Sequence, residues 1–253
     1  MQSEVCEVTE SARLYGNTYI LWLTMPASFQ SAAYGQFVMA YASEYSDPLL
    51  GRAISIHRMR DGERGREFAL LFDVVGRGTD WLARRVPGES VRIVGPLGRG
   101  FEVRPGVQRM LLVGGGIGCA PLIWLADDLV EQGREVTMIL GGRSEAQIFP
   151  PHLLPPSVEV VVTTDDGSAG EQGRVHRALR RRHVPGQRGA QRAEQRRRLV
   201  QALAPLQHGH AVGRHAAADP EFDAVAGELE GADRHRQRSE EHTSELQSRG
   251  LIS

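Results

Sequence analysis

Four short stretches of this chain combine the residue types that bind phosphate groups. The longest, from Met110 to Pro121, reads Met-Leu-Leu-Val-Gly-Gly-Gly-Ile-Gly-Cys-Ala-Pro. Its apolar residues predict a buried parallel strand, and the glycines permit a tight turn that a ligand can approach closely. Because Pro121 suits the first turn of a helix, free amide donors and a positive dipole end should follow, as a pyrophosphate requires. The alternative is a plain connection between strand and helix, since glycine turns are common without ligands.

The other three stretches precede this turn. Arg52 and Ser55 lie three residues apart at the start of a predicted strand and can bind phosphate, although a solvated strand-end arginine is the commoner arrangement. Gly76-Arg77-Gly78-Thr79 precedes a short predicted helix, where it offers either a second anion site or a helix cap. The segment from Gly95 to Phe101, Gly-Pro-Leu-Gly-Arg-Gly-Phe, would by itself be an ordinary turn.

Short strands broken by turns dominate the region from Val5 to Val103. They are predicted at Tyr19–Thr24, Phe37–Tyr41, Ala53–Arg58, Phe68–Val75 and Ser90–Val94, with a hairpin connection at Gly62–Gly65 and one short helix at Thr79–Arg84. Five or six antiparallel strands with this spacing predict a small closed barrel.

A different pattern follows the glycine turn. A helix should run from Pro121 to Val130 and end at Gly133, and two buried strands are predicted at Glu135–Leu140 and Val158–Val162. Strands that alternate with a helix indicate an α/β domain with a parallel sheet. The polar loop Asp165-Asp166-Gly167-Ser168 follows the last strand, at the carboxyl end where open parallel sheets bind ligands.

Composition narrows the function classes. A chain of 253 residues accommodates two domains, and a formal charge of −1 gives no field that favours nucleic acid or an anionic membrane. We see no leader and no apolar run of about 18 residues, so we expect a cytoplasmic protein with no membrane partner. Cys6 and Cys119 are the only cysteines. We interpret them as small buried residues and predict no metal ligands.

The character of the chain changes after Val175. Phe222 is the only aromatic residue beyond it, whereas seven of the nine histidines lie there and arginines cluster. The bias of residues 176–215 resembles a GC-rich gene read in the wrong frame, and Arg238 to Ser248 resembles a translated sequencing adapter. With little apolar material to offset chain entropy, residues 176–253 are predicted to be a non-native, disordered tail.

The order and spacing of the four stretches, together with the strand start Gly35-Gln36-Phe37, resemble one family. It is the electron-transfer subunit of the two-subunit, NAD-linked dihydroorotate dehydrogenase, within the ferredoxin-NADP reductase superfamily. The resemblance covers about residues 5–175, and Gly-Pro-Leu-Gly-x-Gly-Phe is its most specific element. It implies an antiparallel FAD-binding β-barrel over residues 1–103, a truncated parallel-sheet NAD-binding α/β domain over 104–175, and the tail over 176–253. In the superfamily's sheet order a later strand pairs beside the first, so the resemblance also implies that its loss leaves Met110–Val113 as an unprotected sheet edge.

The resemblance also implies the cofactor-binding residues. Arg52–Ser55 and the backbone of Leu71–Asp73 would hold the flavin. The Gly-x-Gly-Thr turn would bind its pyrophosphate, and the long glycine turn would bind the NAD. These residues are Arg52, Ala53, Ile54, Ser55, Leu71, Phe72, Asp73, Gly78, Thr79, Gly114, Gly115, Gly116, Ile117 and Gly118. Ala53 stands where the family usually has proline, which loses a fixed φ angle and little chemistry.

The implied function is electron transfer between NAD(H) and a dihydroorotate dehydrogenase catalytic subunit, in a heterotetramer, through FAD and a 2Fe-2S cluster. Hydride transfer needs no acid or base, so we predict no catalytic residue. The cluster needs four thiolates, which two cysteines cannot supply. The alternatives are a single-component NAD(P)H-flavin reductase, a sulfhydrogenase or ferredoxin oxidoreductase subunit, and a non-catalytic flavin-binding module.

Overall fold

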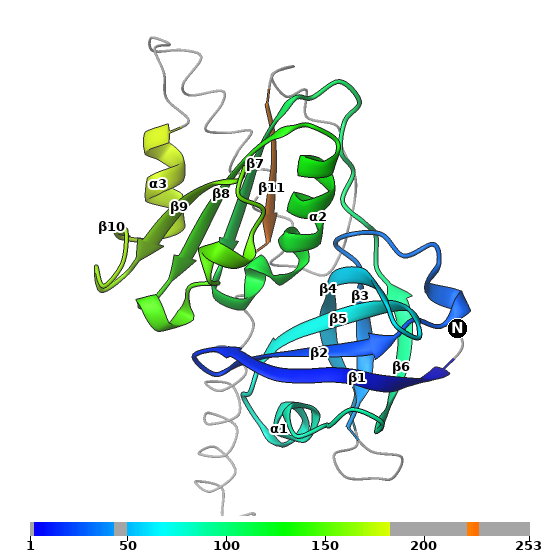
Figure 1. Cartoon of the computed structure of the whole chain (residues 1–253). Coiled ribbons are helices and arrows are strands. Elements are labelled where there is room, and N and C mark those ends of the chain that lie inside the picture. Colours follow the sequence, from blue (N-terminus) through cyan, green and yellow to red (C-terminus); the bar gives the residue numbers. More distant parts are fainter. Residues whose placement is uncertain (1–2, 43–49, 183–221, 228–253) are drawn as a thin grey trace, which may run out of the picture.

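The computed structural model describes residues 3–42, 50–182 and 222–227, which form two domains (Figure 1). We call them the barrel, β1–β6 with α1, and the sheet domain, β7–β11 with α2 and α3. The barrel strands are β1 (Ser3–Tyr15), β2 (Thr18–Thr24), β3 (Phe37–Tyr41), β4 (Arg52–Gly62), β5 (Gly65–Asp73) and β6 (Ser90–Leu97); α1 is Arg77–Ala83. The sheet domain contains β7 (Arg109–Gly115), β8 (Glu135–Gly142), β9 (Glu159–Thr164), β10 (Glu171–Gln172), β11 (Phe222–Gly227), α2 (Ala120–Glu131) and α3 (Val175–Arg182).

The barrel is closed, in the order β1-β2-β5-β4-β3-β6, and every pair of neighbours is antiparallel. Its interior is filled by alternate strand residues such as Leu21, Leu23, Leu70 and Ile93, all fully buried. Because each strand is paired with a neighbour on both sides, the sheet has no edge strand, although the β4–β5 ladder does not run the full length of either strand. The closed antiparallel barrel of five or six strands expected from the turn spacing is therefore confirmed, and it has six strands. Strand β1 was not among the predicted strands.

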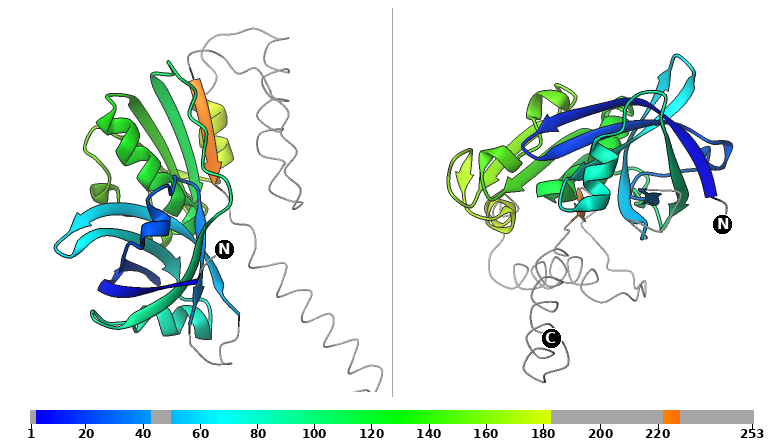
Figure 2. Two further views of the ribbon diagram at one scale, coloured as in Figure 1. Left: turned by 90° about the vertical axis from the view of Figure 1, so that its right-hand side faces the viewer. Right: turned by 90° about the horizontal axis from the view of Figure 1, so that it is seen from below.

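The sheet domain has three layers, with α2 and α3 on opposite faces of a parallel sheet (Figure 2). Its described strands have the order β10-β9-β8-β7-β11. Side chains of β7 alternate between the two faces: Met110 and Leu112 pack with α2, whereas Leu111 and Val113 pack with α3. Burial on both sides explains why this strand is a continuous apolar run rather than an alternating one.

The expected unprotected edge at Met110–Val113 is wrong. Strand β11 pairs with β7 in parallel, from Phe222 opposite Arg109 to Gly227 opposite Gly114. The prediction rested on the low apolar content of residues 176–253. Strand pairing depends mainly on backbone groups, however, and the amides and carbonyls of β7 provide a partner for β11. Residues 183–221 and 228–253 of the expected tail lie outside the described residues.

The start of the expected tail also contributes to the fold. Helix α3 buries Ala178 and Leu179 against Leu111, Ile139 and Val161. The expectation that residues 176–253 add no structure is therefore wrong for this helix. Its two adjacent apolar residues pack on the face of the sheet that α2 does not cover.

The two domains share one apolar core. Ile20, Trp22, Ala69 and Leu71 of the barrel belong to the same buried cluster as Met110 and Leu112 of β7 and the inner face of α2. Two edge-to-face ring contacts cross the same boundary, Tyr15 with Phe149 and Tyr34 with Trp124. Among the described residues, no helix has the length and apolar character that a bilayer span requires.

Candidate functional site

The long glycine turn connects β7 to α2 through one turn of 3-10 helix, Gly116–Cys119. Its glycines differ in their surroundings. A Cβ on Gly114 would lie 2.7 Å from Cα of Cys119, so this glycine is required by packing. A Cβ on Gly115 or Gly116 would have no described atom within 4 Å, and Gly116 has a φ of 51°. The turn thus presents open backbone at Gly115 and Gly116, just before the N-terminus of a 12-residue helix.

In the barrel, the structure brings together two of the predicted stretches. A Cβ on Gly78 would overlap the guanidinium of Arg52, so the arginine side chain lies directly against the bare backbone of the first turn of α1. The same guanidinium donates a hydrogen bond to the carbonyl of Leu50. Among the described residues, no carboxylate forms an ion pair with Arg52. An arginine that has no carboxylate partner among the described residues, and that lies beside backbone amides, is suited to bind a phosphate.

Strands β4 and β5 separate next to this arginine. Their shared ladder runs from the Gly62–Gly65 pair to the Ile56–Leu70 pair and stops there. Beyond that point β4 pairs with β3, where Ser55 is opposite Phe37, and β5 pairs with β2, where Asp73 is opposite Thr18. The predicted flavin-contacting stretches therefore face a gap in the ladder, and the backbone groups along it have no strand partner across the gap.

The side chains of the β5 stretch are turned away from this gap or already bonded. Leu71 and Phe72 are buried in the two cores, and Asp73 accepts a hydrogen bond of 2.5 Å from the hydroxyl of Thr18. A ligand in the gap would consequently meet β5 through its backbone, as the resemblance implies.

Thr79 uses its hydroxyl within the turn. Its Oγ1 accepts hydrogen bonds from the amides of Val75, at 2.9 Å, and Gly76, at 3.2 Å, and donates to the carbonyl of Gly76, at 3.0 Å. The helix-cap interpretation thus accounts for the hydroxyl of Thr79, a residue that is buried. Thr79 shapes the turn that holds Gly78 against Arg52.

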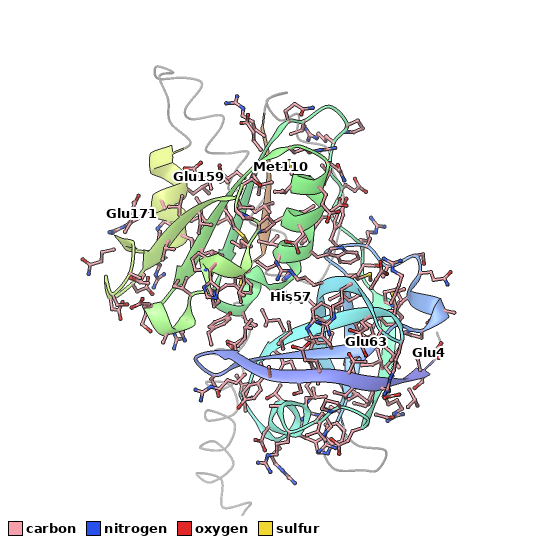
Figure 3. All side chains as sticks on the ribbon, viewed as in Figure 1. Glu4, His57, Glu63, Met110, Glu159 and Glu171 are labelled. Carbon is pink, nitrogen blue, oxygen red and sulfur yellow. The ribbon has the colours of Figure 1, made fainter. Side chains whose placement is uncertain are left out.

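Two residues that join the domains, His57 and Arg58, were not predicted from the sequence. His57 is fully buried, and its Nδ1 lies 2.9 Å from the carbonyl oxygen of Ala120, at the start of α2 (Figure 3). Burial lowers the pKa of His57 to about 3, so its ring is neutral. Arg58 bonds Asp127 of α2 twice, at 2.6 and 3.0 Å. No local sequence signal marks such pairs, because their members are 63 and 69 residues apart.

The cysteines do not provide a metal site. Cys6 lies in the barrel core and Cys119 under the glycine turn, and burial raises the pKa of each thiol to about 12. In the part of the chain that the structure describes, no group of three or more histidine, cysteine, aspartate or glutamate side chains could hold a metal ion. The residues of this chain do not fit a 2Fe-2S cluster, which needs four ligands.

Solved structures share this arrangement of barrel and sheet. An NADH-dependent reduced ferredoxin-NADP oxidoreductase superimposes with a TM-score of 0.62 and 28% identity, over 72% of this chain and 64% of that one. A siderophore utilization protein from T. fusca superimposes with a TM-score of 0.61 over 91% of this chain and 94% of its own, but at 17% identity it shows the fold alone. The chain thus has the ferredoxin-reductase fold.

Similar sequences identify the family within this fold. The electron transfer subunit of dihydroorotate dehydrogenase B (NAD(+)) from Geobacillus sp. strain WCH70 is 35% identical over 186 residues, which are 73% of this chain and 72% of the relative. The corresponding subunit from Desulforamulus reducens is 41% identical over 166 residues. The chain belongs to this family of electron transfer subunits. It spans between 55 and 63% of the length of the first three relatives it matches. No protein-family model matches the chain.

Proposed function

We propose that this chain is the flavin- and nucleotide-binding part of an electron transfer subunit, which exchanges a hydride between NAD(H) and FAD on behalf of a dihydroorotate dehydrogenase catalytic subunit. The observation that carries the proposal is the juxtaposition of Arg52 and Gly78 beside the gap between β4 and β5. Family membership supports the choice of flavin and of partner. A cytoplasmic location and a heterotetramer with the catalytic subunit form part of the same proposal.

The barrel residues fit a flavin nucleotide. Arg52 offers a charged fork for phosphate next to the bare backbone of Gly78, and Ser55 and the Leu71–Asp73 backbone line the gap where a flat ring would be held by backbone groups. The chemistry of the bound FAD would be acceptance or donation of a hydride. The protein residues position it, and none has to exchange a proton for that step, so we assign no catalytic residue.

The glycine turn fits a pyridine nucleotide. Open backbone at Gly115 and Gly116, followed by Ile117 and Gly118 within the 3-10 turn, lets a pyrophosphate approach the N-terminus of α2 closely. We propose NAD rather than NADP because the described strand ends lack a cluster of arginines for a 2′-phosphate, although Arg143 follows β8.

A titration of the full chain with FAD, followed by anaerobic addition of NADH, tests this function. We expect bound flavin with a visible absorbance band, which NADH bleaches faster than NADPH does. A chain that folds but takes up no flavin would contradict the proposal, and faster bleaching by NADPH would contradict the choice of NAD.

A single-component flavin reductase is the second candidate, because the proposed FAD and nucleotide sites alone would allow NAD(H) to exchange a hydride with the flavin. Addition of the catalytic subunit and dihydroorotate separates the two candidates. Reduction of the FAD by dihydroorotate, through the partner, supports the subunit. Turnover with a diffusible acceptor only supports the reductase.

A further inference from the structure

One arginine of the barrel bonds the sheet domain at three points. Arg58 Nε lies 2.6 Å from Asp127 Oδ2, and its Nη2 lies 3.0 Å from Oδ1 of the same carboxylate. Nη2 also donates a hydrogen bond of 2.7 Å to the carbonyl of Leu153, in the 3-10 helix Pro151–Leu153. The Nε and Nη2 side of the guanidinium thus bonds two different segments of the sheet domain, a geometry that lysine cannot reproduce.

A β-bulge explains how the arginine reaches across. Ile56 is opposite Leu70, but Arg58 is opposite Ala69, so β4 contains one residue more than β5 at this point, His57. In a regular strand, consecutive side chains point to opposite faces. Here His57 and Arg58 both point to the sheet domain, because the extra residue redirects one of them.

The two residues hold α2 at separate points on one face. His57 contacts the carbonyl of Ala120, the first residue of α2, and Arg58 bonds Asp127, seven residues later and about two helical turns on. One contact would leave the helix free to pivot, whereas two contacts along its axis fix its direction as well.

The elements joined in this way carry the two proposed cofactor sites. Arg58 lies on β4, three residues after Ser55, which faces the proposed flavin gap. Asp127 lies on α2, which begins directly after the glycine turn. The ion pair therefore connects the strand that would hold the flavin to the helix whose N-terminus would hold the pyridine nucleotide.

We propose that Arg58 is a positioning residue for hydride transfer: with Asp127 it fixes the glycine turn relative to the flavin gap, and so sets the distance between nicotinamide and flavin. This inference rests on the proposed function. Hydride transfer depends steeply on the separation of the reacting atoms, and a displacement of about 1 Å caused by a distant substitution can lower the rate by about 100-fold.

The pair differs from the surface ion pairs of the same molecule. The side chains of Arg58 and Asp127 are 22% and 25% exposed, whereas those of Arg84 and Asp80, on one helix of the barrel, are 72% and 43% exposed. Surface pairs contribute little because water and salt screen them. A half-buried, bidentate pair between domains is suited to fix a geometry.

The test measures flavin reduction by NADH in the full chain, reconstituted with FAD and mixed rapidly. We expect Arg58→Ala and Asp127→Ala to lower the limiting rate constant at saturating NADH by about 10- to 100-fold, with FAD affinity and the half-saturating NADH concentration changed by less than about threefold. Arg58→Lys should fall between wild type and Arg58→Ala. The exchanged pair Arg58→Asp with Asp127→Arg should recover part of the loss.

Arg60→Ala is the matched control. Arg60 lies on the same strand and forms ion pairs with Glu10, at 2.9 Å, and Glu67, at 2.7 Å, but both partners belong to the barrel. It should lower stability without lowering the limiting rate. Equal rate losses in Arg60→Ala and Arg58→Ala, or an unchanged rate in Arg58→Ala, would overturn the proposal.

A second measurement does not depend on the cofactors. Amide hydrogen exchange in residues 114–127 should be faster in Arg58→Ala than in wild type, and unchanged in Arg60→Ala. If wild type binds no FAD, the proposed function fails, and the exchange result still decides whether Arg58 fixes the turn. Unchanged exchange in Arg58→Ala would overturn the positioning role in either case.

Discussion

The barrel and the sheet domain bury their cores in different ways. The barrel closes on itself and fills its interior with residues of its own strands, of α1 and of the 3-10 helix Ala27–Phe29, apart from a contribution by Trp124 of α2. The sheet domain has two faces to cover: α3 covers one, and the other packs through α2 onto barrel residues such as Trp22 and Leu71. The barrel is therefore nearly complete alone, whereas the sheet domain depends on its neighbour.

This difference assigns different roles to the two units. A barrel whose interior is filled mainly by its own residues can retain a cofactor when the sheet domain loosens. The sheet domain receives its orientation from the barrel, through the shared core and through His57 and Arg58. A substitution that destabilises the barrel should consequently destabilise the sheet domain as well, more than a substitution in the sheet domain destabilises the barrel.

The largest expected effect concerns two fully buried leucines, one in each core. Leu112→Ala in β7 and Leu70→Ala in β5 should each lower the free energy of unfolding by about 2–5 kcal/mol, the usual cost of a core cavity. Leu112→Ala should loosen the sheet domain and leave FAD bound, whereas Leu70→Ala should release FAD and unfold both domains together. Urea titrations followed by flavin fluorescence and by circular dichroism separate the two responses.

A control for the leucine variants is Val86→Ala, because Val86 is 55% exposed and should change stability by less than about 0.5 kcal/mol. Release of FAD at the same urea concentration in both leucine variants would show that the barrel is not independent.

The next effect concerns Arg52 alone. Arg52→Ala should weaken FAD binding by about 1.5–3 kcal/mol, the usual contribution of a hydrogen bond to a charged group. Equilibrium titration with FAD measures it. Arg64→Ala is a suitable control, since Arg64 is an exposed barrel arginine that pairs with Glu7 and lies in the hairpin at the opposite end of the β4–β5 ladder from the proposed gap. Equal losses in both variants would mean that the loss reflects general charge rather than a site.

The smallest effect is a pH dependence located at the junction. The pKa of buried His57 is lowered to about 3, below its ordinary value near 6.5, so the unfolded chain binds more protons between these values. Stability from this residue is complete above pH 6.5 and falls as the pH drops toward 3, by at most about 1.4 kcal/mol per pH unit for one proton. His57→Gln should flatten this part of the curve. An identical slope in wild type and variant would exclude His57 as its source.

Local patterns in the sequence were sufficient to predict the barrel. The stretch Phe37–Tyr41 is β3 to the residue, and Gly62–Gly65 forms the predicted hairpin between β4 and β5. Alternation of apolar residues and glycine turns are local signals that predict most of the individual strands. They do not predict the barrel order, in which β2 pairs with β5, and β6 with β1 and β3. In the sheet domain the same holds for the start of α2 after the glycine turn.

Contacts between distant segments could not be predicted in this way. The place of β11 beside β7 depends on backbone pairing between residues more than a hundred positions apart, which composition does not reveal. Likewise, Arg58 had no pattern to distinguish it from other arginines of the strand, because Asp127 and Leu153 become its neighbours only when the domains meet. For the cofactor residues, the sequence predicted the stretches, and their assignment stays a proposal.

The extra residue in β4 has a consequence for how this junction can be lost. Its strand length between Ser55 and Arg58 is one residue, about 3.3 Å, greater than a regular ladder with β5 would need. Deletion of a single codon there would restore regular pairing and leave room for one side chain toward the sheet domain instead of two. A deletion of one residue would therefore remove one of the two polar contacts between β4 and α2, even if every other residue stayed the same.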